Sequence, residues 1–297
     1  MLSTFRFARR LLPVLVFGVL AADRAGAQAP AAPLGVKVYN ADEGSFHVDA
    51  VVISGKTEAV VIDTGFTRAD ALRVAANVLD SGKTLKTIFI SNADPDFYFG
   101  AEVLKGLFPQ AQVLTTPAVR ERIQAKLAGK IAFWGPKLGA NAPQHPIVPE
   151  AISGTTLTVD GEIIEVRGTT GELAHRPYLW IPSLKAIAGN IAVFGNLHVW
   201  TADTQKPSER RAWLAQLDEM LSLRPALVVP GHMAAGTALD ESAIVYTRDY
   251  LKRFESELPK AKNADELIAA MKAAYPKAGL GIALDIGAKV NKGEMKW

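Results

Sequence analysis

The chain has 297 residues, of which 49% are hydrophobic and 21% are charged, and this composition is ordinary for a globular protein with a large core. Its formal charge of +3 comes from the N-terminal segment: 29 basic and 29 acidic residues remain when the four arginines and one aspartate of residues 1–27 are removed from 33 and 30. A neutral remainder argues against nucleic acid or an anionic membrane as the main partner. The sequence contains no cysteine, which excludes disulfides, thiolate metal ligands and a cysteine nucleophile.

Residues 1–27 have the pattern of a secretory signal peptide. Arg6, Arg9 and Arg10 form a basic start, Leu11 to Ala22 is a short apolar segment, and Ala25-Gly26-Ala27 is a small-residue cleavage site. The apolar segment is too short to span a bilayer. We therefore predict a bacterial protein exported to the periplasm or the medium, with no integral membrane segment after cleavage, and the intact mass of the exported protein tests this.

Residues 28–297 are predicted to form a single domain in which strands and helices alternate. Apolar or alternating runs predict strands at residues 36–39, 46–53, 59–62, 85–90, 112–115, 156–166 (a hairpin), 178–181, 186–188 and 226–229. Helical spacing predicts helices at residues 69–81, 101–108, 208–223, 241–255 and 264–275. This alternation indicates a layered α/β fold.

The segment from Gly129 to Pro149 is rich in glycine and proline and carries Phe133 and Trp134. Its composition predicts a long irregular loop, and loops of this length often have a function. The alternative is a surface connection that is packed down by its own aromatic residues.

Four polar turns follow predicted strands. They are Asp63-Thr64-Gly65, the run from Ser91 to Gly100, Gly189-Asn190 after Ile181-Pro182, and Pro230-Gly231-His232. In order and spacing they resemble the motifs of the metallo-β-lactamase superfamily, whose main signature is [ST]-H-x-H-x-D-H-x-x-G. The resemblance covers nearly all of residues 28–297 and implies a four-layer αββα sandwich with a site on one edge, built from the strand-end loops. We expect Asp63 to hydrogen-bond turn amides and so support this site.

The spacing of the family signature is kept in this sequence, but the residues at its metal-ligand positions differ. The first metal site of the family would fall on Asn92, Asp94 and a third residue, for which Glu172 is the expected position and Thr169, Thr170 and His175 are alternatives. The second site would fall on Asp96, Phe97 and His232, with Asn190 in place of the bridging aspartate. The candidate metal ligands are therefore Asn92, Asp94, Asp96, Glu172, Asn190 and His232. Because only Asp96 and His232 match the ligand types of the family, we expect neither a dizinc centre nor standard β-lactamase activity.

Two functions then remain open. One is an altered hydrolase that cleaves an ester, amide or lactone with a single Mn, Mg, Ca or Zn ion in an oxygen-rich site and Asp96 as the general base. The other is a metal-free, non-catalytic protein that binds a small molecule, which is favoured by Phe97 because a phenyl ring fills space and ligates nothing. Arg176 is a candidate internal counter-ion that would remove the need for a metal. Either function implies a small-molecule partner and leaves the oligomeric state open.

Overall fold

The structure is a computed structural model that describes Leu2 and residues 34–297, and residues 34–297 belong to one compact unit. The predicted signal peptide and the start of the domain up to residue 33 lie outside the described residues, apart from Leu2. Within the described part of the chain, no helix combines the length and the hydrophobicity needed to cross a membrane.

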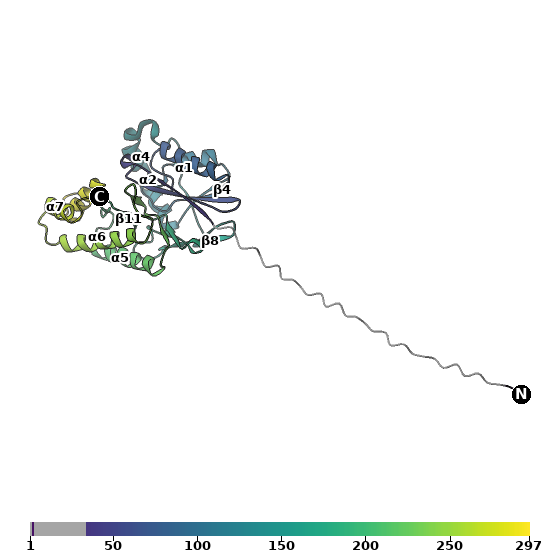
Figure 1. Ribbon diagram of the computed structural model, residues 1–297. Helices are drawn as coiled ribbons and strands as arrows, with labels where there is room; N and C mark the ends of the chain where they lie inside the picture. The colour runs from purple at the N-terminus through teal and green to yellow at the C-terminus, as the bar shows by residue number, and fades with distance from the viewer. Residues whose placement is uncertain (1, 3–33) are drawn as a thin grey trace. The chain divides into compact units, whose positions relative to one another are not determined.

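Two β-sheets form the centre of this unit (Figure 1). The first has the strand order β1-β2-β3-β4-β5-β6, antiparallel from β1 to β3 and parallel from β3 onward. Its strands are β1 (Gly35–Asn40), β2 (Asp49–Ser54), β3 (Glu58–Ile62), β4 (Thr84–Phe89), β5 (Gln112–Thr115) and β6 (Glu150–Ala151).

The second sheet has the strand order β12-β10-β9-β8-β7. Its strands are β7 (Thr156–Val159), β8 (Glu162–Arg167), β9 (Tyr178–Ile181), β10 (Ala186–Ala188) and β12 (Leu227–Val228). A short parallel pair, β11 (Phe194–Gly195) and β13 (His232–Met233), follows at the strand ends and carries His232.

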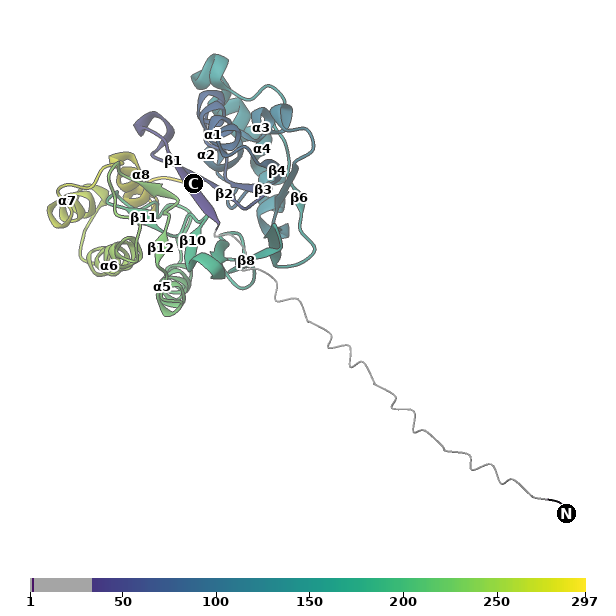
Figure 2. The same cartoon turned by 45° about the vertical axis from the view of Figure 1, so that its right-hand side comes forward.

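Eight α-helices of the described residues cover the two sheets (Figure 2). They are α1 (Arg68–Ser81), α2 (Pro95–Tyr98), α3 (Ala101–Leu107), α4 (Pro117–Leu138), α5 (Pro207–Ser222), α6 (Ser242–Glu257), α7 (Ala264–Ala274) and α8 (Gly281–Asn291). Figure 2 shows α1, α3 and α4 beside the first sheet, whereas α5 and α6 lie beside the second.

Three hydrophobic clusters correspond to the three interfaces between these layers. Because side chains alternate along a strand, Val52 and Val61 pack with α1, α3 and α4, while Val51 and Val60 face the second sheet. The opposite face of the second sheet packs against α5 to α8 through residues such as Trp213. The predicted αββα sandwich is therefore confirmed.

Two helical segments differ from the sequence prediction. Residues 129–138 belong to α4 and not to an irregular loop, so the loop proper begins only at Gly139. Pro136 lies inside this helix near its C-terminal end, where it has no N–H to donate to the carbonyl oxygen of Ala132. Helix α8 was not predicted, because glycines at 279 and 281 interrupt its pattern, yet Ala283, Leu284 and Ala288 are buried against the second helical layer.

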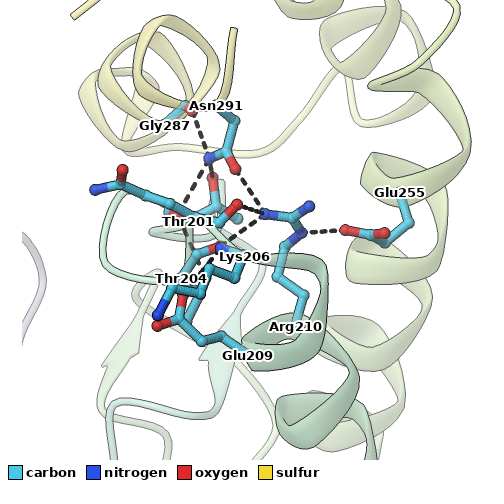
Figure 3. Close-up of polar contacts among 9 residues, drawn as sticks. Thr201, Thr204, Lys206, Glu209, Arg210, Glu255, Gly287 and Asn291 are labelled. Atoms are coloured by element: carbon cyan, nitrogen blue, oxygen red, sulfur yellow. Dashed lines mark hydrogen bonds and ion pairs between the residues drawn. The ribbon is translucent and has the colours of Figure 1, made fainter. Parts of the chain in front are cut away.

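A buried arginine holds the loop between β11 and α5 (Figure 3). Arg210 donates hydrogen bonds to the carbonyl oxygens of Thr204 (2.8 Å) and Gln205 (2.7 Å) and to Oδ1 of Asn291 (2.7 Å), and it forms an ion pair with Glu255. The network thereby joins α5, α6 and α8 to the loop that precedes α5. That loop carries Trp200 and Asp203, which reach the candidate site described below.

A second polar network fixes the loop before β2. Asp70 closes a capping box with Thr67 at the start of α1 and also accepts hydrogen bonds from the hydroxyls of Tyr39 and Ser45, both at 2.6 Å. These bonds keep the pKa of Asp70 below its usual value against the opposing effect of burial. The network positions the neighbouring Phe46, whose ring and carbonyl both belong to the site.

Candidate functional site

The loop that begins the signature run from Ser91 to Gly100 follows the end of β4, and Asp63 binds its first residue. The Asp63 carboxylate accepts hydrogen bonds from the backbone N–H and from Oγ of Ser91, both at 2.7 Å. Oδ1 of Asn92 accepts from the backbone N–H of Asp94 at 2.8 Å, which forms a local turn. The supporting role predicted for Asp63 is confirmed, and Asn92 uses its side-chain oxygen within the loop.

Asp96 and His232 are brought together. Oδ2 of Asp96 lies 3.5 Å from Nε2 of His232, and the two side chains are 9% and 5% exposed. Burial raises the pKa of Asp96 to about 7. Among the described residues, no other residue donates a hydrogen bond to this carboxylate.

The His232 ring has a fixed tautomer. Its Nδ1 lies 2.9 Å from the carbonyl oxygen of Phe46, and because a carbonyl only accepts, Nδ1 carries the proton. Phe97 packs edge-on at 5.3 Å and Phe194 stacks at 5.1 Å. Burial lowers the pKa of His232 to about 4, so the neutral ring presents the lone pair of Nε2 toward Asp96.

Basic side chains of the chain itself surround Asp94. Nζ of Lys130 lies 3.6 Å from Oδ1 of Asp94. Burial raises the pKa of Asp94 to about 6, with Asp203 adding to the rise and Lys130 opposing it. Asp203 in turn accepts hydrogen bonds from the indole N–H groups of Trp200 (2.7 Å) and Trp297 (2.9 Å).

Arg176 is fully buried behind Asp94. Its guanidinium stacks 3.9 Å from the centroid of the Trp213 ring and donates to the carbonyl oxygen of Ile191 at 3.2 Å, while Nε and Nη1 have no hydrogen-bond partner among the described residues. Burial lowers its pKa to about 10, which leaves it charged at neutral pH. A small polar cavity of about 20 Å³ adjoins it, lined among others by Asn92, Asp94 and Arg176. Arg176 and Asp94 therefore line the same small cavity, but the structure shows no ion pair between them, and the counter-ion role of Arg176 stays a prediction.

The remaining predicted ligands do not converge on this point. Glu172 is exposed and accepts a hydrogen bond from Oγ of Ser208 at 2.7 Å, so its assignment as the third ligand is corrected. Nδ2 of Asn190 donates to the carbonyl oxygen of Val229 at 3.3 Å, and Oδ1 of Asn190 is buried without a partner in the described part of the chain. His175, one of the alternatives to Glu172, lines the small polar cavity, and burial lowers its pKa to about 3.

The residues present do not fit a metal ion. No group of three or more histidine, aspartate or glutamate side chains within Leu2 and residues 34–297 is arranged to hold one. Asp96 and His232 give two ligands, whereas protein metal sites of the expected kinds use three or more. A cation beside Asp94 would meet the ammonium of Lys130 and the guanidinium of Arg176, which repel it.

An apolar cavity of about 190 Å³ opens above Asp96 and His232. Its aromatic walls are Phe46, Phe66, Phe133, Trp134, Phe194, Trp200 and Trp297. The rings support one another, since Trp134 packs edge-on against Phe66 at 5.1 Å and against Phe46 at 5.7 Å. Helix α8 closes a further side with Leu280, Ile282, Ala283 and Ile286. Concave, mostly apolar sites with a few converging polar groups are typical of small-molecule binding.

Several residues of this site were not identified from the sequence. Lys130 fell in the segment that was predicted as a loop, and Trp200, Asp203 and Trp297 belong to segments without a motif. Lys126, Lys130, Phe133 and Trp134 are spaced as residues on one face of a helix. This spacing was the local signal that could have grouped Lys130 with the aromatic residues Phe133 and Trp134.

Comparisons with known proteins agree with the fold. The family model described as the metallo-beta-lactamase superfamily matches residues 44–232. A crystal structure of a metallo-beta-lactamase family protein from Thermus thermophilus is similar with a TM-score of 0.62 and 17% identity, covering 88% of this chain and 92% of that one. The DIM-1 metallo-beta-lactamase is similar with a TM-score of 0.53 and 17% identity, over 75% of this chain and 98% of that one. A search of curated proteins gave no match. At these identities the structural likeness concerns the fold alone.

Proposed function

The chain belongs to the metallo-beta-lactamase superfamily, and from this premise we propose that it binds a small apolar molecule in the aromatic cavity without a metal ion. The observation that carries the proposal is the cavity itself, which stands above the Asp96–His232 pair and has aromatic walls drawn from separate parts of the chain. Export from the cytoplasm, as the N-terminal segment predicts, is part of the same proposal.

Lys130 and Arg176 would then balance the negative charge of the site, which a metal ion does in the family. Lys130 lies 3.6 Å from Asp94, and Arg176 lines the small polar cavity that Asp94 also lines, so positive charge from the chain itself is present beside this carboxylate. Phe97 packs on His232 in place of a ligand. In this proposal the loops at the strand ends keep their positions, and the residues at the metal positions of the family form the polar floor of a ligand pocket.

The size of the cavity indicates a small ligand. Drug-sized ligands occupy sites of roughly 300 Å³ or more, and an engineered apolar cavity of about 150 Å³ binds benzene. A cavity of about 190 Å³ therefore suits one aromatic ring with a short side chain.

Binding of 2-phenylethanol tests this function. Since Trp134, Trp200 and Trp297 line the cavity, we expect a saturable change in tryptophan fluorescence, with an affinity confirmed by calorimetry. Trp134→Ala removes a wall ring and should weaken binding about tenfold, which corresponds to about 1.4 kcal/mol.

The matched control is Phe108→Ala, because Phe108 is a partly buried ring that packs in the helical layer of the first sheet and does not line the cavity. It should leave the affinity for 2-phenylethanol unchanged. Equal affinities of the wild type and Trp134→Ala, or the lack of any saturable signal in the wild type, would contradict the proposed site.

Hydrolysis of an ester, amide or lactone is a second candidate function. It is favoured by the position of Asp96, whose carboxylate lies at the base of the cavity and is free of donors from other described residues. In that role Asp96 would take the proton of an attacking water as the general base. A panel of aryl esters and lactones tests this function. Turnover by the wild type that Asp96→Asn abolishes would support hydrolysis. Equal rates of hydrolysis with and without the protein would exclude it for that panel.

A further inference from the structure

The polar floor of the aromatic cavity is rich in hydrogen-bond acceptors. Asp94 and Asp96 present carboxylate oxygens to the cavity, and Nε2 of His232 lies 3.5 Å from Oδ2 of Asp96. The donor among these floor residues is Lys130. A ligand that satisfies this floor must therefore bring donors of its own.

The charges of the floor residues also favour a ligand that brings a positively charged group. Lys130 lies 3.6 Å from Asp94 and so already compensates that carboxylate. Asp96 is buried, and among the described residues no lysine or arginine nitrogen lies within 4 Å of its carboxylate. Arg176 does not line the aromatic cavity. A positively charged group on the ligand would complete the pairing of Asp96, and a buried carboxylate is stabilised by such a pair.

The walls also suit a cation. The faces of Trp and Phe rings attract a positive charge within about 6 Å, most strongly where the charge is desolvated. Phe46, Trp134, Phe194 and Trp200 all line the volume above the floor. The chain itself shows this preference, since Nζ of Lys130 lies 5.6 Å from the centroid of the Trp297 ring.

We infer that the ligand of this cavity is a primary amine with a compact apolar body, whose ammonium group donates to Asp96 and Asp94. The inference rests on the proposed function, since it names the ligand class of the same site. A carboxylate ligand would face two carboxylates and compete with Asp94 for Lys130. A neutral ligand of the same shape would fill the walls and leave Asp96 without a counter-charge.

Three ligands with one phenyl ring and different polar groups test the inference: 2-phenylethylamine, 2-phenylethanol and phenylacetate, titrated into the full protein by calorimetry near pH 8. For the wild type we expect the amine to bind at least tenfold tighter than the alcohol, and phenylacetate to bind more weakly than either. In Asp96→Asn, which keeps the shape of the side chain, the amine should lose its tenfold advantage while the alcohol retains its affinity.

The control variant is Glu172→Gln, which removes an exposed carboxylate outside the cavity and should preserve the advantage of the amine. If the amine and the alcohol bind the wild type equally, or if phenylacetate binds best, the inference is wrong while the aromatic cavity stands. If none of the three binds, the proposed function fails with it. Should Asp96→Asn not fold, the ranking of the three ligands on the wild type decides.

Discussion

Replacing Arg210 by alanine is expected to lower the free energy of unfolding by about 3–5 kcal/mol. The guanidinium is buried, and its loss leaves the carbonyl oxygens of Thr204 and Gln205 and the side chain of Asn291 without their donor, and Glu255 without its counter-charge. Urea unfolding measured by circular dichroism gives the value. Because the same bonds hold the loop with Trp200, the affinity for 2-phenylethanol should also fall.

The neighbouring residue on α5 provides the control. Arg211 is exposed, so Arg211→Ala should change the unfolding free energy by no more than about 0.5 kcal/mol. If Arg210→Ala were as stable as Arg211→Ala, the network in Figure 3 would not be what holds this loop in place.

Replacing Gly231 by alanine should destabilise the fold by about 3 kcal/mol or more. A Cβ atom at this position would overlap the backbone oxygen of Asn190, and since the three nearest atoms are all backbone, no flexible side chain could move away. The same overlap would displace His232 from Asp96. The melting temperature and urea unfolding of the variant measure the effect.

Gly129→Ala is the control for glycine replacement as such. Gly129 lies within α4, and an added Cβ would meet no atom of the described residues within 4 Å. Alanine favours the helix by up to about 1 kcal/mol, so this variant should be as stable as the wild type or more stable. An equally small effect at Gly231 would show that the close approach to Asn190 is not a constraint.

The fold could be predicted from the sequence because the motifs at its strand ends are short and local in the chain. Gly100 and Gly231 each lie where a Cβ atom would overlap a backbone oxygen, of Thr64 and Asn190 respectively. Such positions require glycine whether or not a metal is bound. This explains how the motif order survives although the histidines of the signature do not.

The aromatic cavity could not be predicted, because its walls come from segments that are far apart in the chain. Trp134 lies on α4, Trp200 precedes α5 and Trp297 follows α8, and no spacing rule connects them. Glu172 was expected as the third ligand from the family resemblance, but the loop that carries it places it at the surface. Local patterns fix turns and strand ends, whereas the convergence of side chains depends on tertiary packing.

The central claim is that side chains of this protein replace the metal centre of the superfamily. Elemental analysis by plasma mass spectrometry, on protein purified without chelator or affinity metal, tests it most directly. The account predicts far less than one equivalent each of Zn, Mn, Fe, Ca and Mg, and a melting temperature that neither EDTA nor added zinc changes. One equivalent of any of these metals, retained in Glu172→Ala and lost in Asp96→Ala or His232→Ala, would contradict it.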